Sequence, residues 1–535
     1  MTTRDPGMQF LNNLLRGRFN RRQAMIGSAA AGTTLALGGS LGMTQAVAAQ
    51  DAEPTGEVVW GLDVVVPNVI PFGGIALSQW QGKEFMYDSL LAWDADLNVL
   101  PALAESWETP DDTTYVFNLR QGVKFHNGKD MTAADVIYSL NTALNPPEPG
   151  VKVPYLDNVA SVEAIDDYTV QVTMTKADPT LSGTLAWTHY TPIIPEGILD
   201  EIEWLSDGVG TGPFKLAEYI QDDQIVYEAF PDFWGDKPGV QKLTLKMLTD
   251  EQQRVAALRS GEIDGANFSA DVASTLASDD ITVLSGLTSS PCVVQINITD
   301  PASPWADLRV RQAISKTVNR QDIIDKVYGG YAQLTAAIPP GYGIWPLPPE
   351  ELEAAYAVDV EGAKALMEEA GYTDGFEVTL QTIAGTAHVR SSEIIQQALE
   401  QLNIKVSVEP IEIGTFAENV GKGEFQWAQT ARGMRGDPSA HVVDFRSGTS
   451  NNVNWFGDGW ANEDLNALFD EGLATLDEER RLEIYLEIQR IIAEEVPNLY
   501  LVQPEKFQAV NNRLQGMYVF YGNTNLGLRT VTVAE

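Results

Sequence analysis

The sequence predicts an α/β protein with more than one domain. Residues 376–380 and 406–408 alternate apolar with polar side chains, as strands do, and the segment between them has the apolar spacing of a helix. A strand, a helix and a strand within about 35 residues form a βαβ unit, which implies a parallel sheet. About 485 residues follow the N-terminal leader, more than a single hydrophobic core usually organises. Two or three domains are therefore expected.

Residues 1–49 are expected to be a twin-arginine signal peptide. They contain five arginines against one acid, and Arg21-Arg22 stands just before an apolar stretch rich in Ala and Gly. Small residues at 46–48 supply a signal peptidase site. Paired arginines mark the twin-arginine export route of bacteria. A retained membrane anchor is the alternative, but the stretch is short and weakly apolar for a lasting span. We expect a soluble protein in the periplasm of a Gram-negative bacterium.

The charge of the chain excludes some classes of partner. The whole chain has 35 basic and 74 acidic residues, a net charge of −39. Five of the arginines and one of the acids lie in the leader, so the exported part carries a net charge of −43. So acidic a chain opposes binding to nucleic acid or to anionic lipid. We expect no nucleic-acid partner.

The cysteines and histidines argue against a metal site. Cys292 is the single cysteine, which excludes an internal disulfide and a Cys-based zinc site. The four histidines are His126, His189, His388 and His441, and none are paired at ligand spacing. We expect no metal, no cofactor and no catalytic residue. An exported hydrolase or redox enzyme is the alternative that the leader favours, but the chain shows no nucleotide-binding motif.

Residues 108–176 are predicted to form a small, mainly β insertion. Tyr115, Phe117 and Leu119 alternate with polar residues, and two more alternating runs flank the turn Asp166-Asp167. A helix over 132–144 is expected inside the insertion, with Thr132 as its N-cap.

A glycine-rich run and several amphipathic helices are predicted in the rest of the chain. The glycine-rich run 208–214 is expected to be a tight crossing between domains, because Pro213 stands where a phosphate-binding helix would begin. Amphipathic helices are predicted over 363–370 and 482–495, and another after Ser391-Ser392.

Several stretches, in this order along the chain, resemble a known family. They are residues 87–91, 101–107, 115–128, 133–136, 210–214, 232–235, 258–264, 307–314, 363–372 and 436–438. The similarity is to the extracellular solute-binding proteins of family 5 of ABC importers, which include dipeptide, oligopeptide and nickel receptors. It covers nearly the whole exported chain.

The resemblance implies a two-lobed periplasmic-binding-protein fold of the cluster C type, with an extra small β-rich domain in the N-terminal lobe. The expected division is a leader over 1–49, lobe I over 50–107, 208–300 and 505–535, the extra domain over 108–207, and lobe II over 301–504. It also implies a function: capture of a peptide or peptide-like solute between the lobes and delivery to the transmembrane subunits of an ABC permease. An opine, modified amino acid, sugar or metal chelate is the alternative ligand. We expect a monomer that meets the twin-arginine translocase only during export.

The loop after residue 431 is the main predicted ligand contact. In the dipeptide branch of the family, an acid three residues before the Asp of Gly-Asp-Pro binds the ligand's amino group. That position here is Met434, which puts an ordinary dipeptide in doubt. Arg432 and Arg435 flank it and can grip a carboxylate or phosphate at two points. The ligand is therefore predicted to carry an anionic group and to meet Asp437 as well. Pairing of both arginines with the many acids is the alternative.

Six further residues are predicted to line the cleft. Trp187 and His189 belong to an aromatic cluster that suits a ligand, with the domain core as the alternative. His388 and Arg390 lie between a strand end and a helix start, a usual place for ligands, with an exposed loop as the alternative. Phe72 and Trp455 are expected to form part of the walls of the cleft.

Overall fold

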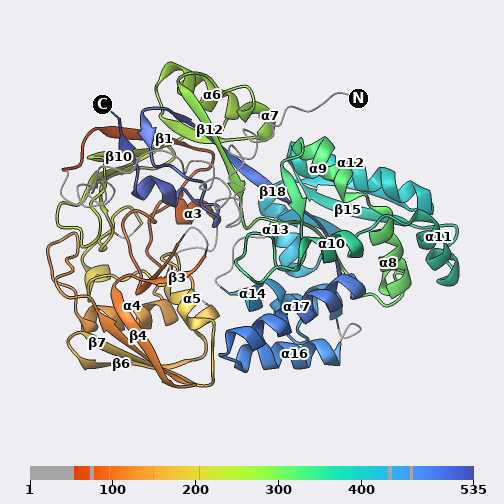
Figure 1. Ribbon diagram of the computed structural model, residues 1–535, viewed down its shortest axis with the longest axis horizontal. Coiled ribbons are helices and arrows are strands. Elements are labelled where there is room, and N and C mark those ends of the chain that lie inside the picture. Colours follow the sequence, from red (N-terminus) through yellow and green to blue (C-terminus); the bar gives the residue numbers. More distant parts are fainter. Residues whose placement is uncertain are drawn as a thin grey trace, which may run out of the picture. The chain divides into compact units, whose positions relative to one another are not determined.

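The computed structural model describes residues 53–72, 77–94, 97–148, 150–152, 154–203, 205–431, 437–457 and 462–534. Residues Pro54–Glu535 form one compact unit. Of the other unit, Met1–Glu53, only Glu53 is described, so the predicted leader lies outside the described residues. Within the compact unit, helices and strands gather in two halves on either side of the long strand β18 (Asn498–Asn511) (Figure 1).

A single twelve-stranded sheet runs through both halves and is continuous at β18. Its main order is β16-β15-β17-β13-β18-β11-β1-β10-β9-β8, and β12 and β14 also pair with β18. The first part of β18, as far as Pro504, pairs with β13 (Cys292–Ile296) and β14 (Ala332–Leu334). The part from Glu505 onward pairs with β12 (Ile281–Leu287) and β11 (Gly265–Phe268). The chain thus changes halves inside β18, and a first time between β12 and β13.

The first half is built around a parallel pair, β1 (Glu57–Leu62) and β10 (Lys242–Met247). Every residue of β11 is buried, and Trp60 of β1 is fully buried beside it. The other elements of this half are α3 (Leu77–Gln81), β2 (Leu91–Trp93), β3 (Val99–Pro101), α5 (Leu181–Leu185), β8 (Phe214–Ile220), β9 (Gln224–Ala229), α6 (Glu251–Ser260), α7 (Ala270–Ala273), β19 (Leu514–Gln515) and β20 (Thr532–Val533).

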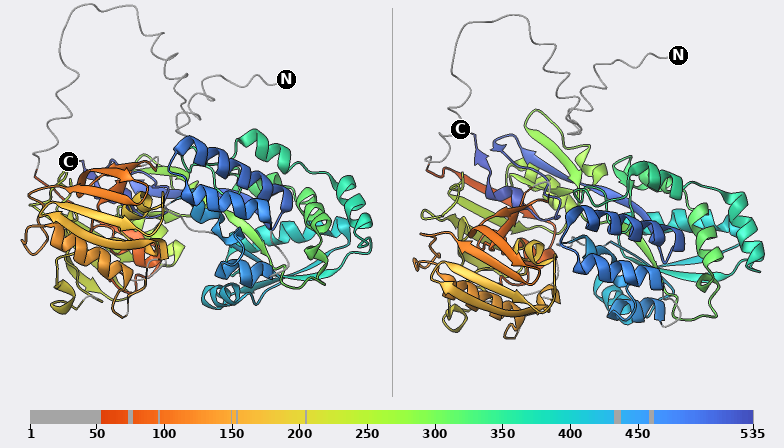
Figure 2. Two further views of the ribbon diagram at one scale, coloured as in Figure 1. Left: turned by 90° about the horizontal axis from the view of Figure 1, so that it is seen from below. Right: turned by 60° about the horizontal axis from the view of Figure 1, so that its bottom comes forward.

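The predicted β-rich insertion contains a sheet of its own, in the order β4-β5-β7-β6. Its strands are β4 (Ala104–Asp111), β5 (Thr114–Leu119), β6 (Val159–Asp166) and β7 (Thr169–Met174). The predicted helix is α4 (Ala133–Leu144), and the capping box between Thr132 and Asp135 is present. α4 packs across β6 and β7, as the views in Figure 2 show.

The second half contains the predicted βαβ unit. β15 (Glu377–Ile383) and β16 (Lys405–Ile411) are parallel, with Val378 opposite Val406. The connecting helix α12 (Thr386–Leu399) begins five residues before Ser391, which corrects the predicted start. Ser391 donates its hydroxyl to the Ala387 carbonyl from inside the helix, so it is not a cap. The other elements are α8 (Leu308–Thr317), α9 (Arg320–Tyr328), α10 (Pro349–Ala355), α11 (Val360–Glu369), α13 (Ile413–Lys422), β17 (Trp427–Ala431), α14 (Pro438–Val442), α15 (Ser450–Phe456), α16 (Glu463–Ala474) and α17 (Glu478–Glu495).

The glycine-rich run leads tightly into β8. A Cβ added to Gly210 would lie 2.2 Å from the carbonyl oxygen of Met86, so only glycine fits there. The His126 ring holds the run from the other side: Nε2 donates to the Gly212 carbonyl at 2.9 Å, and Nδ1 accepts from the Gly210 N–H at 3.3 Å. Close packing against Met86 and Tyr87 accounts for these glycines.

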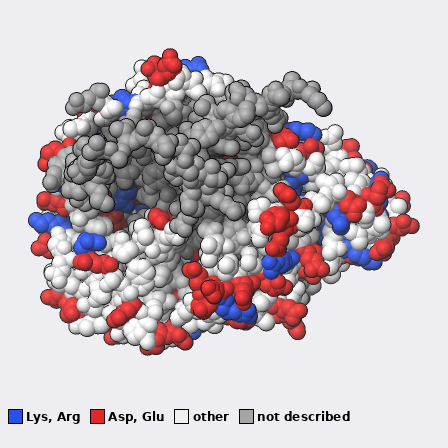
Figure 3. All heavy atoms as spheres, in the orientation of Figure 1, with Lys and Arg blue, Asp and Glu red and all other residues white. Residues whose placement is uncertain are grey.

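Acidic side chains are spread over both halves on the face shown in Figure 3, with basic ones among them. Several pair at the surface of the second half, such as Arg480 with Glu471 at 2.7 Å and Arg490 with Glu351 at 2.9 Å. No helix in the described ranges is both long enough and apolar enough to cross a membrane.

Candidate functional site

A pocket of ≈ 440 Å³ lies where the chain passes between the halves, and is termed the crossing pocket. The first half contributes the end of β11 and α7. The second half contributes α9, α12 and the end of β17. The lining residues are Phe268, Ser269, Ala270, Asp271, Thr288, Ser290, Cys292, Val327, Tyr328, Tyr331, Ala387, His388, Arg390, Ala431, Pro504, Glu505, Lys506, Phe507 and Asn523.

Arg390 connects the two walls of the crossing pocket. Its Nη1 lies 3.9 Å from the carboxylate of Asp271 on α7, and its Nη2 donates to the backbone carbonyl of Lys326. The side chains are 47% and 83% exposed, so water screens this pair and it adds little stability. The guanidinium is therefore open to exchange Asp271 for an anionic ligand group.

Burial shifts the pKa of three other groups that line the crossing pocket, His388, Lys506 and Cys292. Burial lowers the pKa of His388, and its Nδ1 has no hydrogen-bond partner among the described residues. Burial also lowers the pKa of Lys506, against the opposing effect of Asp63 and Glu84, while its Nζ donates to the Asn523 carbonyl at 3.0 Å. Burial raises the pKa of Cys292 to about 11. The pocket thus contains hydrogen-bond donors of both lobes, including Arg390 and Lys506.

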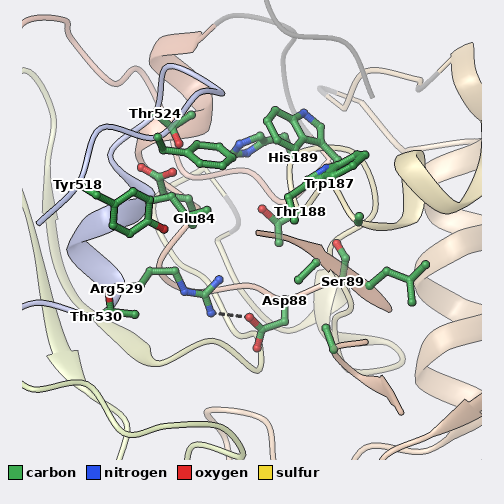
Figure 4. A pocket seen from close by; sticks show the side chains of 17 residues that line it. Glu84, Asp88, Ser89, Trp187, Thr188, His189, Tyr518, Thr524, Arg529 and Thr530 are labelled. Carbon is green, nitrogen blue, oxygen red and sulfur yellow. Dashed lines mark hydrogen bonds and ion pairs between the residues drawn. The ribbon is translucent and has the colours of Figure 1, made fainter. Parts of the chain in front are cut away.

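A second pocket, of ≈ 220 Å³, lies within the first half and is termed the aromatic pocket (Figure 4). His189 stacks on Trp80 with ring centroids 4.8 Å apart, and Trp187 meets Trp80 edge-on at 5.8 Å. The lining residues are Glu84, Asp88, Ser89, Leu91, Ala92, Trp93, Ala102, Ala186, Trp187, Thr188, His189, Tyr518, Phe520, Thr524, Leu526, Arg529 and Thr530. Burial and the nearby Lys83 lower the pKa of His189 well below its ordinary value, so the ring is neutral.

Two carboxylates line the aromatic pocket and differ in their partners. Asp88 forms an ion pair with Arg529, drawn as a dashed line in Figure 4, and accepts further bonds from Trp234 at 2.8 Å and Thr211 at 3.2 Å. Glu84 accepts one backbone bond, from Asn525 at 3.1 Å. Burial raises the pKa of Glu84 to about 7. Asp88 is thus fully engaged, whereas Glu84 is a buried carboxyl without an ion-pair partner in the described part of the chain.

Comparison with known proteins decides the family. The model of the bacterial extracellular solute-binding proteins, family 5 (Middle), matches residues 98–453. The chain belongs to this family. The Haemophilus influenzae heme-binding protein A is 30% identical over 457 residues, which cover 78% of this chain and 81% of the relative. The Escherichia coli dipeptide-binding protein is 28% identical over 463 residues, which cover 79% and 84%.

A solved structure extends the likeness to three dimensions. The PBP AgaA of A. tumefaciens R10, in complex with agropinic acid, superposes with a TM-score of 0.75 and 26% identity. The match covers 90% of this chain and 99% of that one. The predicted family and the two-lobed α/β fold are therefore confirmed, and the halves on either side of β18 are the two lobes. Members of family 5 are binding proteins that serve ABC importers, which is the function class that the sequence predicted.

The structure brings four of the predicted ligand residues into pockets. His388 and Arg390 line the crossing pocket, and Trp187 and His189 line the aromatic pocket. Since α12 begins at Thr386, His388 and Arg390 lie in its first two turns and not in a loop. Arg432, Met434 and Arg435 lie outside the described residues. Ala431, directly before them in the chain, lines the crossing pocket. The ligand-binding role of all these residues stays a prediction.

Three other predicted residues lie in packed surroundings. Asp437 caps α14 by accepting from the Ser439 N–H at 2.9 Å, and its carboxylate pairs with Arg481. Trp455 is buried, with its indole N–H donating to the Val420 carbonyl at 2.8 Å. Phe72 is buried in the core of the first lobe. None of the three lines either of the two pockets described above.

Sequence reasoning missed the charged residues of the aromatic pocket, namely Glu84, Asp88 and Arg529. A signal was present: Lys83, Glu84 and Asp88 interrupt an apolar run that includes Phe85, and charges in such a run are buried only for a reason. Their pairing with the C-terminal segment spans more than 400 residues of chain, which no local pattern indicates. Among the described residues, no cluster of His, Cys, Asp and Glu is arranged to hold a metal ion.

Proposed function

We propose that this protein is a periplasmic receptor that captures a peptide or peptide-like solute in the crossing pocket and delivers it to an ABC permease. The observation that carries the proposal is that both lobes line this pocket, on either side of strand β18, which belongs to both. The relationship to the Escherichia coli dipeptide-binding protein supports a peptide-like ligand. A solute held by both lobes favours their closure, because its contacts are complete only when the lobes are together.

The solute is proposed to carry an anionic group. Ala431 lines the crossing pocket, and Arg432 and Arg435 follow it closely in the sequence. Met434 stands where an ammonium-binding acid would be needed for a simple dipeptide. Arg390 and the imidazole of His388 add donors inside the same pocket. A guanidinium recognises a carboxylate or phosphate at two points, which makes such a group the best complement to this set.

An opine, modified amino acid, sugar or metal chelate is the second candidate ligand. The observation that favours it is the likeness to AgaA, a receptor solved with agropinic acid, at 26% identity over most of the chain. A peptide, an opine and a modified amino acid each carry a carboxylate and differ in the rest of the ligand, whereas a neutral sugar would not fit the anionic-group proposal.

The chain is further proposed to leave the cytoplasm through the twin-arginine translocase, with residues 1–49 removed, and to act as a monomer. The paired Arg21-Arg22 ahead of an apolar stretch supports this route. Replacing both arginines with lysine is expected to keep the protein in the cytoplasm, as seen by cell fractionation. Export of the variant at the unmodified level would contradict the proposal.

A ligand screen tests the receptor function. Peptides, opines, sugars and metal chelates are compared by thermal shift, since a ligand of the folded state alone raises its melting temperature. The identified ligand is then titrated into the double variant Arg432→Ala, Arg435→Ala. We expect a loss of affinity of about tenfold to a hundredfold, from two charge-assisted contacts. The exposed pair Arg446→Ala, Arg480→Ala is the matched control. Unchanged affinity in the first variant would remove the anionic-group proposal.

A further inference from the structure

Glu84 is the carboxyl of the aromatic pocket that forms no ion pair with any described residue. It is 1% exposed, and its Oε1 accepts the single backbone bond from Asn525. The side chain of Thr524 interacts with the Glu84 carboxylate and lowers its pKa. The contact is not a well-formed hydrogen bond by distance and angle, and within the described ranges Oε2 of Glu84 has none. A buried acceptor of this kind is costly unless a partner arrives from outside the chain.

The nearby positive charges are committed elsewhere. Arg529 pairs with Asp88 across the pocket, as Figure 4 shows. Lys506 donates to the Asn523 carbonyl and lines the crossing pocket. Both cations lower the pKa of Glu84, but burial outweighs them. The Glu84 carboxyl therefore remains in the lining of the aromatic pocket as a hydrogen-bond acceptor that these cations do not neutralise.

The remaining walls suit a cation. Trp187, His189, Tyr518 and Phe520 line the same space with aromatic rings, and ring faces attract ammonium and guanidinium groups. The His189 ring is neutral, so it does not repel a positive group. A volume of ≈ 220 Å³ is smaller than the roughly 300–1,000 Å³ of pockets that take a whole drug-sized ligand, and so fits one end of a solute.

We propose that the aromatic pocket binds an alkylammonium group of the captured solute, with Glu84 as its carboxylate partner. The inference rests on the proposed receptor function, because the ammonium belongs to the solute that the lobes capture. Asn523 lines the crossing pocket and Thr524 lines the aromatic pocket, so a single peptide bond of the chain separates the two sites. The proposal requires a solute whose cationic end enters the aromatic pocket while its anionic end lies in the crossing pocket.

The test uses small probes that contain no peptide group. n-Butylammonium chloride and 1-butanol, which have the same shape and differ in charge, are titrated into the purified protein by ligand-observed NMR. For the ammonium probe we expect a dissociation constant of about 1 mM, the affinity of a small fragment. We expect 1-butanol to bind at least about tenfold more weakly. Equal binding of the two probes, or no binding of either, overturns the proposal.

The variant Glu84→Gln keeps the shape of the side chain and removes its charge. We expect the affinity for n-butylammonium to fall by about tenfold or more, as the loss of one buried charge partner requires. Glu163→Gln, on an exposed position of β6, is the control for the change in net charge. Affinity retained in Glu84→Gln overturns the proposal. The comparison of the two probes on the unmodified protein does not depend on the folding of any variant.

The outcomes separate this inference from the receptor function. A ligand screen without a hit contradicts the receptor proposal and leaves the probe results standing. A screened solute that binds Glu84→Gln as tightly as the unmodified protein contradicts the ammonium site and leaves the receptor function intact.

Discussion

Asp437 and Arg481 form a buried ion pair that joins the N-terminus of α14 to the long helix α17. One guanidinium nitrogen of Arg481 lies 2.8 and 3.0 Å from the two carboxylate oxygens, and the side chains are 7% and 10% exposed. The guanidinium also lies over the rings of Trp345 and Tyr485. Asp437, predicted as a ligand contact, is therefore engaged by α14 and α17.

Removal of one partner of this pair is expected to destabilise the second lobe strongly. Asp437→Ala leaves the Arg481 charge buried without its partner, which costs about 3–5 kcal/mol of unfolding free energy. Urea denaturation measures it. Arg480→Ala is the control: Arg480 and its partner Glu471 are 47% and 44% exposed, and we expect a loss below about 1 kcal/mol. Similar losses of unfolding free energy in both variants would show that the buried pair contributes no more to stability than the exposed pair.

Glu84 is expected to make the protein less stable as the pH rises. Its pKa is about 7 when folded, against 4.5 ordinarily, so between these values the folded state holds a proton that the unfolded state has lost. Stability falls through this window, by up to about 3 kcal/mol, and stays lower above it. Glu84→Gln removes this loss, and its stability relative to the unmodified protein should increase from pH 5 to pH 8 in urea denaturation. Glu163→Gln should show no such trend. A constant difference between Glu84→Gln and the unmodified protein would contradict the assignment.

Gly210 and Gly421 are expected to respond oppositely to alanine. A Cβ at Gly210 would meet the Met86 carbonyl at 2.2 Å, so Gly210→Ala should cost about 1–3 kcal/mol or more. Gly421 lies inside α13 with nothing within 4 Å of the added atom, so Gly421→Ala should stabilise by about 0.5–1 kcal/mol. The melting temperatures of both variants, measured by thermal unfolding, test these two expectations. A neutral Gly210→Ala would mean that the loop can move away from Met86.

Cys292 is expected to be unreactive until the protein unfolds. Burial raises the pKa of its thiol to about 11, and the side chain is 1% exposed. The thiolate, which is the reacting form, is then about a hundredfold rarer at pH 8 than for an ordinary thiol. Ellman's reagent should label the native protein at no more than about a hundredth of the rate in guanidinium chloride. Rapid labelling of the native protein would mean that the crossing pocket admits the reagent freely.

Local patterns predicted much of the fold. Alternation at Tyr115, Phe117 and Leu119 located β5, and the same pattern at Val378 and Val406 located a parallel strand pair. Thr132 and Asp135 located the start of α4. These predictions succeed because the periodicity of strands and helices, and the capping of helices, depend on residues that are close in the sequence. The start of α12 was predicted wrongly, because serines suit both a cap and a bond back to a carbonyl inside a helix, and only the packed helix selects one.

The site was less accessible to sequence reasoning. Trp187 and His189 were singled out by their aromatic character, and they line a pocket. Asp437 was singled out by its motif, but its partner Arg481 is 44 residues away in the chain. Nothing near Glu84 or Arg529 in the sequence indicates that the two line the same cavity.

The sequence by itself determined the acidic character, the expected export signal, the family and the type of most helices and strands, because these follow from composition and from neighbours along the chain. Only the tertiary structure decided which charges are neutralised. Asp437 and Asp88 each have a distant arginine, whereas Glu84 has none in the part of the chain that the structure describes. Burial and pairing depend on segments such as 518–530 folding back onto residues near 84. The unmatched carboxyl is a property of that long-range packing.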